Sequence, residues 1–257
     1  MLGAIAGDII GSRFEGHPAP PTGFELFHRD CRFTDDTVCT VAVADAILRE
    51  ADFAVTLRAF VRRHPKAGYG GMFLRWAFTD AAPAYGSWGN GAPMRVAAVG
   101  WLARDAEEAE ALAAAQSKVS HDHADAVKAA QAVAGSILML RQGHTVPAVR
   151  AWIQETCGYD LRPEVALTSG GFDVSAAGTV PPALAAAFEA TDWEGAVRKA
   201  VCLGGDTDTL ACIAGGVAEA IHGVPRKIAH RARDLLTDDL REVLDRFVLG
   251  VAPKDRE

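Results

Sequence analysis

The stretch Gly204-Gly205-Asp206-Thr207-Asp208-Thr209 stands directly before a run of helical periodicity at residues 210–221. The two glycines permit a tight backbone turn, and two carboxylates and two hydroxyls follow them in consecutive positions. A second group of the same chemistry, Thr34-Asp35-Asp36-Thr37, opens another helical run. Carboxylate and hydroxyl oxygens are hard ligands that suit Mg²⁺, Ca²⁺ or Mn²⁺ better than zinc. We therefore expect two helix starts that face one another around one or two divalent cations.

Helical periodicity recurs along most of the chain, and convincing alternating strands are absent. Apolar residues return with the spacing of amphipathic helices in one segment after another. The best candidate for a strand, residues 172–175, is short and lies in a glycine-rich loop that we expect at residues 167–182. Polar residues stand where helix starts need an N-cap, namely Asp52, Asp105, Thr145, Thr191 and Asp192. These features predict an all-α fold of roughly ten helices.

Composition and charge exclude several classes of protein. With 49% hydrophobic and 23% charged residues, the chain of 257 residues has an ordinary globular composition and enough apolar residues for a sizeable core. A net charge of −7 argues against a large nucleic-acid-binding surface. The five cysteines form no CxxC pair, and their odd number indicates reduced thiols rather than a disulfide framework. Because a basic signal-peptide start and a membrane-length apolar stretch are lacking, we expect a cytoplasmic monomer without membrane or stable nucleic-acid partners.

Both acidic groups have a competing interpretation as helix caps. Threonine and aspartate are common at helix starts, where the macrodipole also favours carboxylates, so capping explains one acid in each group. Two neighbouring carboxylates exceed what one cap needs, and their repulsion favours a bound cation. The second group is no EF-hand, because Leu210 occupies the third ligand position and Ala211 the position that requires glycine. Both interpretations stay open, and two such groups in one chain favour the metal site.

Three glycines, Gly3, Gly7 and Gly11, recur at every fourth position near the start of the chain. This spacing predicts a helix whose small residues let a neighbouring backbone come close. Asp8 is polar among apolar neighbours on that helix, so we expect it to bond another helix end rather than to bind metal. Glu15, just beyond the helix, is a solvated surface charge when judged from the sequence alone.

Two further polar segments are candidates for ligand contacts. The segment Ser87-Trp88-Gly89-Asn90-Gly91 either presents backbone N–H groups and an aromatic face to a phosphate-bearing ligand or forms a plain Gly-Asn turn. In Ser120-His121-Asp122-His123 the two histidines are too close in sequence to share a helix face. We therefore expect a helix cap there, with His121 facing ligand or backbone, rather than a metal site.

The order and content of these motifs resemble the ADP-ribosylglycohydrolase family over nearly the whole chain. The resemblance is carried by Gly3-Ala4-Ile5-Ala6-Gly7-Asp8-Ile9-Ile10-Gly11 with Glu15, Phe33-Thr34-Asp35-Asp36-Thr37, Trp88-Gly89-Asn90-Gly91-Ala92-Pro93-Met94-Arg95, Ser120-His121, Gly178-Thr179-Val180-Pro181 and Leu203-Gly204-Gly205-Asp206-Thr207-Asp208-Thr209. The Thr-Asp-Asp and Gly-Gly-Asp-x-Asp-Thr motifs are its most specific part. The resemblance implies one domain over residues 1–257, folded as a single compact orthogonal bundle of helices.

The same resemblance implies a site and an activity. Members of this family hold two divalent cations, usually Mg²⁺ or Mn²⁺, and hydrolyse ADP-ribosyl linkages. At the positions that match the family's motifs, the resemblance implies that the metal ligands are Thr34, Asp35, Asp36, Asp206, Asp208 and Thr209. It implies that the catalytic acids are Glu15, Asp35 and Asp36. The residues expected to bind the substrate are Trp88, Gly89, Asn90, Gly91, His121, Gly178 and Thr179. Some members use an acid between the two central loops, where Asp80 is the nearby acid in this sequence.

The expected function is metal-dependent hydrolysis of the glycosidic bond between ADP-ribose and an acceptor on a protein, small molecule or nucleic acid. The acceptor stays open among arginine, serine, an acetyl ester, a nucleobase and a nucleic-acid end. Two alternatives use the same residues differently. One is a phosphoesterase with paired cations, which would release phosphate or AMP, and the other is a non-catalytic protein that binds ADP-ribose. The complete set of ligand positions argues against the second alternative.

Overall fold

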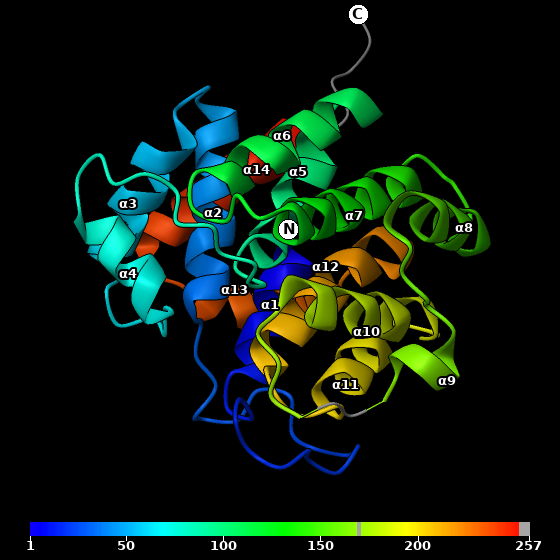
Figure 1. Ribbon diagram of the computed structural model, residues 1–257. Coiled ribbons are helices and arrows are strands. Elements are labelled where there is room, and N and C mark those ends of the chain that lie inside the picture. Colours follow the sequence, from blue (N-terminus) through cyan, green and yellow to red (C-terminus); the bar gives the residue numbers. More distant parts are fainter. Residues whose placement is uncertain (169–170, 252–257) are drawn as a thin grey trace, which may run out of the picture.

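Helices make up nearly all of the regular structure in the computed structural model, which describes residues 1–168 and 171–251 (Figure 1). Within these residues there are fourteen α-helices, one 3₁₀ turn and no strand. The elements are α1 (Leu2–Gly11), α2 (Asp35–Leu48), α3 (Phe53–Arg63), α4 (Gly71–Phe78), η1 (Pro93–Arg95), α5 (Ala97–Leu102), α6 (Ala106–Lys118), α7 (Ala124–Arg141), α8 (Val146–Cys157), α9 (Pro163–Ala166), α10 (Ala176–Phe188), α11 (Trp193–Val201), α12 (Thr207–His222), α13 (Arg226–Asp234) and α14 (Asp238–Val251). The all-α prediction is confirmed. The expected number of roughly ten helices is lower than the fourteen observed in the described residues, and α9, with only 4 residues, is too short for helical periodicity to reveal it.

N-caps fix the starts of many helices, and four of the five predicted caps are confirmed. The side chains of Asp52, Asp105, Thr145 and Asp192 each accept a hydrogen bond from a backbone N–H three residues further on, at 2.8, 2.9, 3.4 and 2.7 Å. Thr191 is not a cap, because α11 begins after its neighbour Asp192. Such bonds satisfy N–H groups that lack a partner inside the helix.

The predicted loop at residues 167–182 is shorter than expected, because α10 begins at Ala176 and runs through Pro181 and Pro182. The hydroxyl of Ser175 caps this helix by accepting from the backbone N–H of Gly178 at 2.9 Å. Packing of the buried helix outweighs the hydrogen bonds that the prolines cannot donate. The strand candidate at 172–175 makes a single antiparallel bridge, Gly89 to Ser175, and Ser169 and Gly170 of the same loop lie outside the described residues.

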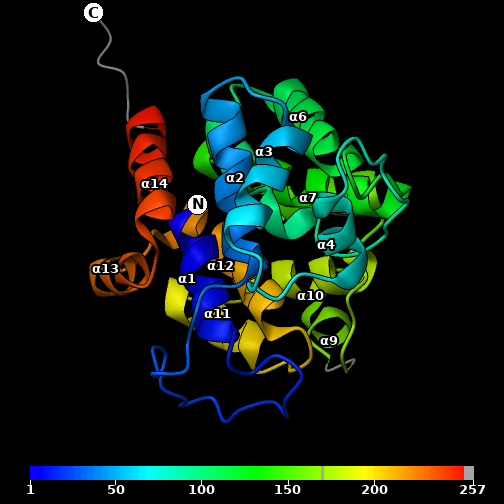
Figure 2. The same ribbon diagram turned by 90° about the vertical axis from the view of Figure 1, so that its left-hand side faces the viewer.

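Helices α1 and α12 lie side by side at the centre of the molecule (Figures 1 and 2), and Figure 2 shows α13 and α14 to one side of them. They run antiparallel, because methyl groups added at Gly3, Gly7 and Gly11 would overlap the carbonyl oxygens of Gly215, Ala211 and Thr207 in turn. The predicted role of these glycines in close helix packing is therefore confirmed. Close packing here places the C-terminal end of α1 beside the N-terminal end of α12, where the acidic motif lies.

Gly7→Ala is expected to lower the free energy of unfolding by at least about 2 kcal/mol, since a methyl group has no room between the two backbones. Denaturant titration followed by circular dichroism measures the change. Gly71→Ala in α4 is the control, because a methyl group there would meet no heavy atom within 4 Å. An equal loss of stability in both variants would contradict the proposed packing of α1 on α12.

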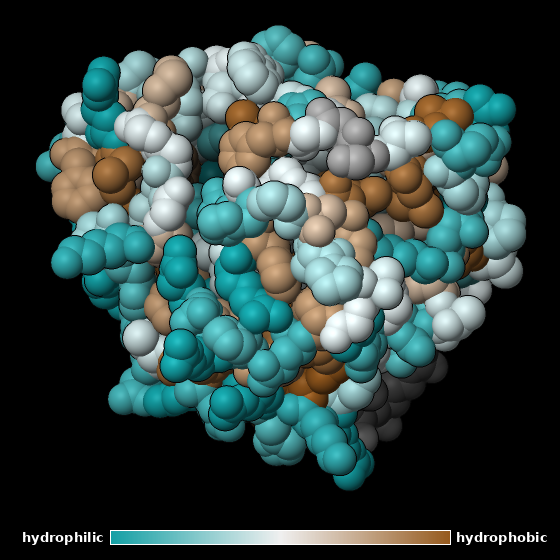
Figure 3. Space-filling view, turned by 90° about the horizontal axis from the view of Figure 1, so that it is seen from below, coloured by the Kyte–Doolittle hydropathy of each residue, from teal (hydrophilic) through white to brown (hydrophobic). Residues whose placement is uncertain are grey.

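The face of the molecule seen in Figure 3 carries a mixture of hydrophilic and hydrophobic side chains, with the hydrophobic ones in small separate groups. The long loop that follows α1 runs along this lower side in Figures 1 and 2. Among the described helices, none combines the length and the apolar character needed to cross a membrane.

Candidate active site

The C-terminal half of α1 lies against the starts of α2 and α12 (Figure 2). We call the place where these three helix ends meet the acidic junction. Asp8 on α1 caps α2: it accepts from the backbone N–H and hydroxyl of Thr34 at 2.9 and 2.6 Å, and from the same groups of Thr37. The hydroxyl of Thr207 on α12 donates to the carbonyl oxygen of Gly11 at 2.9 Å. The expectation that Asp8 bonds another helix end is confirmed, and the two acidic motifs are brought together.

Carboxylates converge at this junction in two overlapping groups. Oxygen atoms of Asp8, Asp36 and Asp208 lie within 4.8 Å of one another, and so do oxygen atoms of Glu15, Asp206 and Asp208. Asp208 belongs to both groups, so it joins them. Glu15, which the sequence alone presents as a surface charge, therefore lies beside the second acidic motif.

The turn before α12 holds this arrangement through two glycines with left-handed backbone. Gly204 has a φ of 74° and Gly205 a φ of 77°, and other residues adopt this region only at an energetic cost. A methyl group at Gly205 would also overlap the carbonyl oxygen of Gly171. The backbone N–H of Gly16 donates to the carbonyl oxygen of Gly205 at 3.0 Å, which ties the loop carrying Glu15 to this turn.

Burial and mutual repulsion make these carboxylates difficult to ionise together. Burial, followed by the charge of Asp8, raises the pKa of Asp35 to about 8. Burial and neighbouring carboxylates raise the pKa values of Asp36 and Asp208 well above their ordinary range. Burial raises the pKa of Asp8 to about 6 although four hydrogen bonds oppose it, and burial also raises the pKa of Glu15. A nearby positive charge would favour the ionised forms.

The donor set fits a hard divalent cation. Within the described part of the chain, Asp36 Oδ1 is buried without a hydrogen-bond partner, while its Oδ2 accepts from the hydroxyl of Thr209 at 3.3 Å. An unpaired buried carboxylate oxygen is costly, and Mg²⁺ or Mn²⁺ would satisfy it. Both oxygens of Asp8 are already hydrogen-bonded, so this residue is occupied as a cap. The hydroxyl of Thr34, a predicted ligand, donates to Asp8.

A cavity of about 570 Å³ opens beside the acidic groups. Its walls come from the starts of α2 and α12, from α4 and from the loops at 85–91 and 172–174. Two exposed aromatic side chains, Trp88 with 53% and Phe172 with 57% of their surface exposed, belong to this lining. The predicted site residues among the lining are Glu15, Asp35, Asp36, Trp88, Gly89, Asn90, Gly91, His121, Asp206, Asp208 and Thr209.

His121 stands in the wall of this cavity between two aromatic rings. The ring centroids of Phe73 and Tyr85 each lie 5.9 Å from that of His121. A methyl group at Gly91 would lie 2.7 Å from His121 Nε2, so this edge of the ring faces the glycine turn. Burial and then the charge of Arg95 hold the pKa of His121 well below its usual range, which keeps the ring neutral.

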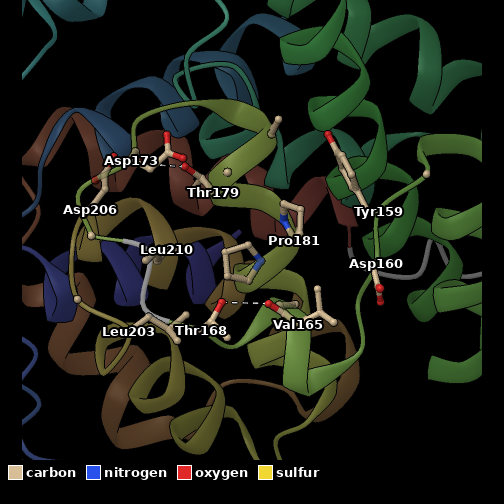
Figure 4. A pocket seen from close by; sticks show the side chains of 17 residues that line it. Tyr159, Asp160, Val165, Thr168, Asp173, Thr179, Pro181, Leu203, Asp206 and Leu210 are labelled. Atoms are coloured by element: carbon tan, nitrogen blue, oxygen red, sulfur yellow. Dashed lines mark hydrogen bonds between the residues drawn. The ribbon is translucent and has the colours of Figure 1, made fainter.

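Gly178 and Thr179 do not belong to this cavity lining. They line a second pocket of about 390 Å³ together with residues of α9 and α10 (Figure 4). Asp206 lines both pockets, and the amide of Asn90 donates to Asp206 at 2.6 Å and to Thr179 Oγ1 at 3.1 Å. Asn90 is therefore engaged in holding a carboxylate of the acidic junction, and Thr179 supports Asn90 from behind.

Asp80 is exposed, pairs with Arg62 at 2.5 Å and lies outside the cavity lining. Several lining residues were not assigned to the site from the sequence, among them Phe73, Tyr85 and Arg95. When an aromatic residue stands in an apolar segment, the sequence does not show whether its side chain lines a cavity or packs in the hydrophobic core. Arg95 belongs to a quoted motif, but nothing in the sequence reveals that its side chain is fully buried.

Comparisons with known proteins identify the family of this chain. The family model described as ADP-ribosylglycohydrolase matches residues 1–257. The chain is 28% identical over 129 residues to ADP-ribosylhydrolase ARH3 of Xenopus tropicalis, which covers 38% of this chain and 37% of that protein. It is 21% identical over 306 residues to ADP-ribosylhydrolase ARH3 of Mus musculus, which covers 87% of this chain and 83% of that protein. A solved structure named "ADP-ribosylglycohydrolase-related protein complex" superposes with a TM-score of 0.76 and 26% identity, over 98% of this chain and 95% of the other. The chain therefore belongs to the ADP-ribosylglycohydrolase family, an enzyme family of the glycosidase class.

Proposed function

We propose that this chain hydrolyses the glycosidic bond between ADP-ribose and an acceptor, and that it depends on divalent cations held where α1, α2 and α12 meet. The observation that supports the proposal is the pair of carboxylate groups that share Asp208 and border the cavity of about 570 Å³. This volume lies within the range of roughly 300–1,000 Å³ for sites that enclose small-molecule ligands. One domain over residues 1–257, a monomeric state and a cytoplasmic location stay predictions.

The residues that would hold two cations, Mg²⁺ or Mn²⁺, are Thr34, Asp35, Asp36, Asp206, Asp208 and Thr209. When bound, such cations supply positive charge that orients ribose hydroxyls and lowers the pKa of a bound water. Asn90 keeps Asp206 in place through its 2.6 Å hydrogen bond. Thr209 donates to Asp36 Oδ2, which leaves the unpaired Oδ1 as the available ligand atom.

Hydrolysis breaks the bond between C1″ of the ribose and the acceptor atom and forms a bond between C1″ and a water oxygen. We assign Glu15 to take the proton of the attacking water and to deliver it to the acceptor atom. Its carboxylate lies at the edge of the acidic junction, and burial together with the charge of Asp206 raises its pKa. Asp35 and Asp36 would stabilise the positive charge that develops at C1″.

The remaining cavity lining suits the ADP part of the ligand. Trp88 offers an exposed aromatic face for stacking, and the glycines of the turn at 86–91 let a diphosphate approach the backbone N–H groups. His121 offers a neutral ring nitrogen in the same wall. We propose that these residues bind ADP-ribose while the acidic junction handles the ribose next to the acceptor.

The test is product analysis on a panel of ADP-ribosyl conjugates with arginine, serine, acetyl-ester and nucleic-acid linkages. Release of intact ADP-ribose in Mg²⁺ or Mn²⁺, lost after EDTA treatment and restored by either ion, is the expected result on at least one linkage. Activity that survives EDTA would refute the metal dependence. Release of phosphate or AMP would identify a phosphoesterase, and tight binding of ADP-ribose without turnover on any linkage would identify a non-catalytic binding protein.

A further inference from the structure

Arg95 is a buried cation without a carboxylate partner. Its side chain is fully buried, and no carboxylate of the described residues lies within 4.0 Å of it. Its Nε donates to Gln116 Oε1 at 2.6 Å, and one terminal nitrogen donates to the carbonyl oxygen of Gln116 at 2.7 Å and to Ser120 Oγ at 3.1 Å. A buried charge held only by neutral groups is costly, so its presence in a cavity wall calls for a role.

The hydrogen bond from Arg95 determines what Ser120 can do. Ser120 is fully buried, and its Oγ has two neighbours, the donor Arg95 and, at 2.8 Å, the Nδ1 atom of His121. Arg95 has no acceptor to offer, so the Ser120 hydroxyl hydrogen cannot point toward it. The arrangement that satisfies both the Ser120 hydroxyl and His121 Nδ1 has the hydroxyl donating to Nδ1.

This direction of donation fixes the tautomer of the histidine. A neutral imidazole that accepts at Nδ1 carries its hydrogen at Nε2. His121 Nε2 faces Gly91 in the cavity wall, and no group of the described chain hydrogen-bonds to it. Since burial and then the charge of Arg95 hold the pKa of His121 low, the ring offers a single N–H to a ligand.

We propose that Arg95 and Ser120 are positioning residues, which fix His121 as its Nε2–H tautomer so that the ring donates to an oxygen of the bound ADP-ribosyl group. The choice of ligand rests on the proposed function, whereas the tautomer does not. In this arrangement Arg95 acts through the hydroxyl of Ser120 and contacts no ligand itself.

The first test reads the tautomer directly in the full chain with Mg²⁺. Long-range ¹H–¹⁵N NMR spectra of ¹⁵N-histidine-labelled protein, assigned with His121→Gln, are expected to show a pyridine-type Nδ1 and a pyrrole-type Nε2 for His121. In Ser120→Ala this signal is expected to move toward the opposite tautomer or an exchange average, and Ser120→Thr is expected to restore it. A wild-type spectrum with the proton on Nδ1 would overturn the proposal, whether or not the protein proves to be an ADP-ribosyl hydrolase.

The second test is a double-mutant cycle on ADP-ribose binding, measured by titration calorimetry. Ser120→Ala is expected to raise the Kd about tenfold, the effect of a lost ligand hydrogen bond. In a His121→Ala background, Ser120→Ala is expected to have no further effect, because Ser120 acts only through the ring. Ser136→Ala, which removes a hydroxyl from an equally buried serine of α7 bonded to Ala132, is the matched control with unchanged Kd.

Independent, additive effects of the two substitutions would refute the action of Ser120 through His121. A wild-type protein that binds no ADP-ribose would refute the proposed function, and the NMR result would then still decide the tautomer.

Discussion

Asp208→Asn is expected to abolish the thermal stabilisation that Mg²⁺ or Mn²⁺ gives to this protein. Asp208 is the shared member of both carboxylate groups, so its loss affects every cation bound between them. A ligand at one hundred times its Kd stabilises the folded state by about 2.7 kcal/mol, which corresponds to roughly 5–10 °C for a chain of this size. Thermal melts with EDTA and with each ion measure the difference between the wild type and the variant. Hydrolysis of an ADP-ribosyl conjugate is expected to fall at least about 100-fold in the same variant.

Asp45→Asn is the matched control for this experiment. Asp45 has only 3% of its surface exposed, like Asp208, but it binds Arg246 at 2.7 Å and Arg49 at 3.2 Å, away from the acidic junction. Its substitution breaks a tether between α2 and α14 and is expected to lower the melting temperature, while the increase on adding metal stays complete. Equal metal-induced shifts in Asp208→Asn and Asp45→Asn would contradict the placement of cations at the junction.

Local rules explain why so much of the fold was predictable. Helical periodicity and N-caps depend on residues within one turn, so Asp52 and Asp105 could be recognised without any tertiary information. The spacing of the glycines in α1 likewise predicted close packing, but it could not name α12 as the partner. The position of α10 was missed because Pro181 and Pro182 are local signals against a helix, and buried packing overrides them.

The part of the candidate site whose functional side chains stand close together in the sequence was predictable. The part that depends on contacts between distant segments was not. Asp206 and Asp208 stand out because two carboxylates exceed what a cap needs. Asn90 was expected to bind substrate, yet its amide reaches across the fold to Asp206. Arg95 gave no sequence signal of its own, because its effect on the site depends on Ser120 lying beside it in the folded chain.

The metal-free protein is expected to lose stability as the pH rises from 6.5 to 8.5, and Mg²⁺ is expected to reverse this trend. Burial and the charge of Asp8 raise the folded-state pKa of Asp35 from 3.8 to about 8. A carboxyl with a raised pKa binds its proton more tightly in the folded state, so its contribution to stability is complete below pH 4 and is lost as the pH rises through about 8. One pKa unit corresponds to about 1.4 kcal/mol, which gives a loss of about 2 kcal/mol from Asp35 alone over this window. Asp36 and Asp208 titrate in the same direction.

The pH window separates this effect from that of His121. A histidine with a lowered folded-state pKa destabilises the folded state only as the pH falls through its unfolded pKa of 6.5, so between pH 6.5 and 8.5 it changes the stability by only about 0.4 kcal/mol, and in the opposite direction. Melting temperatures in EDTA should therefore fall across the window, and the difference between Mg²⁺ and EDTA should widen, because bound cations keep the carboxylates ionised. Asp35→Asn should reduce the slope in EDTA, since an amide does not titrate, while Asp36 and Asp208 keep part of it. A melting temperature in EDTA that rises with pH would show that these carboxylates are already ionised and stabilised by protein groups alone, and the case for cations at the junction would fail.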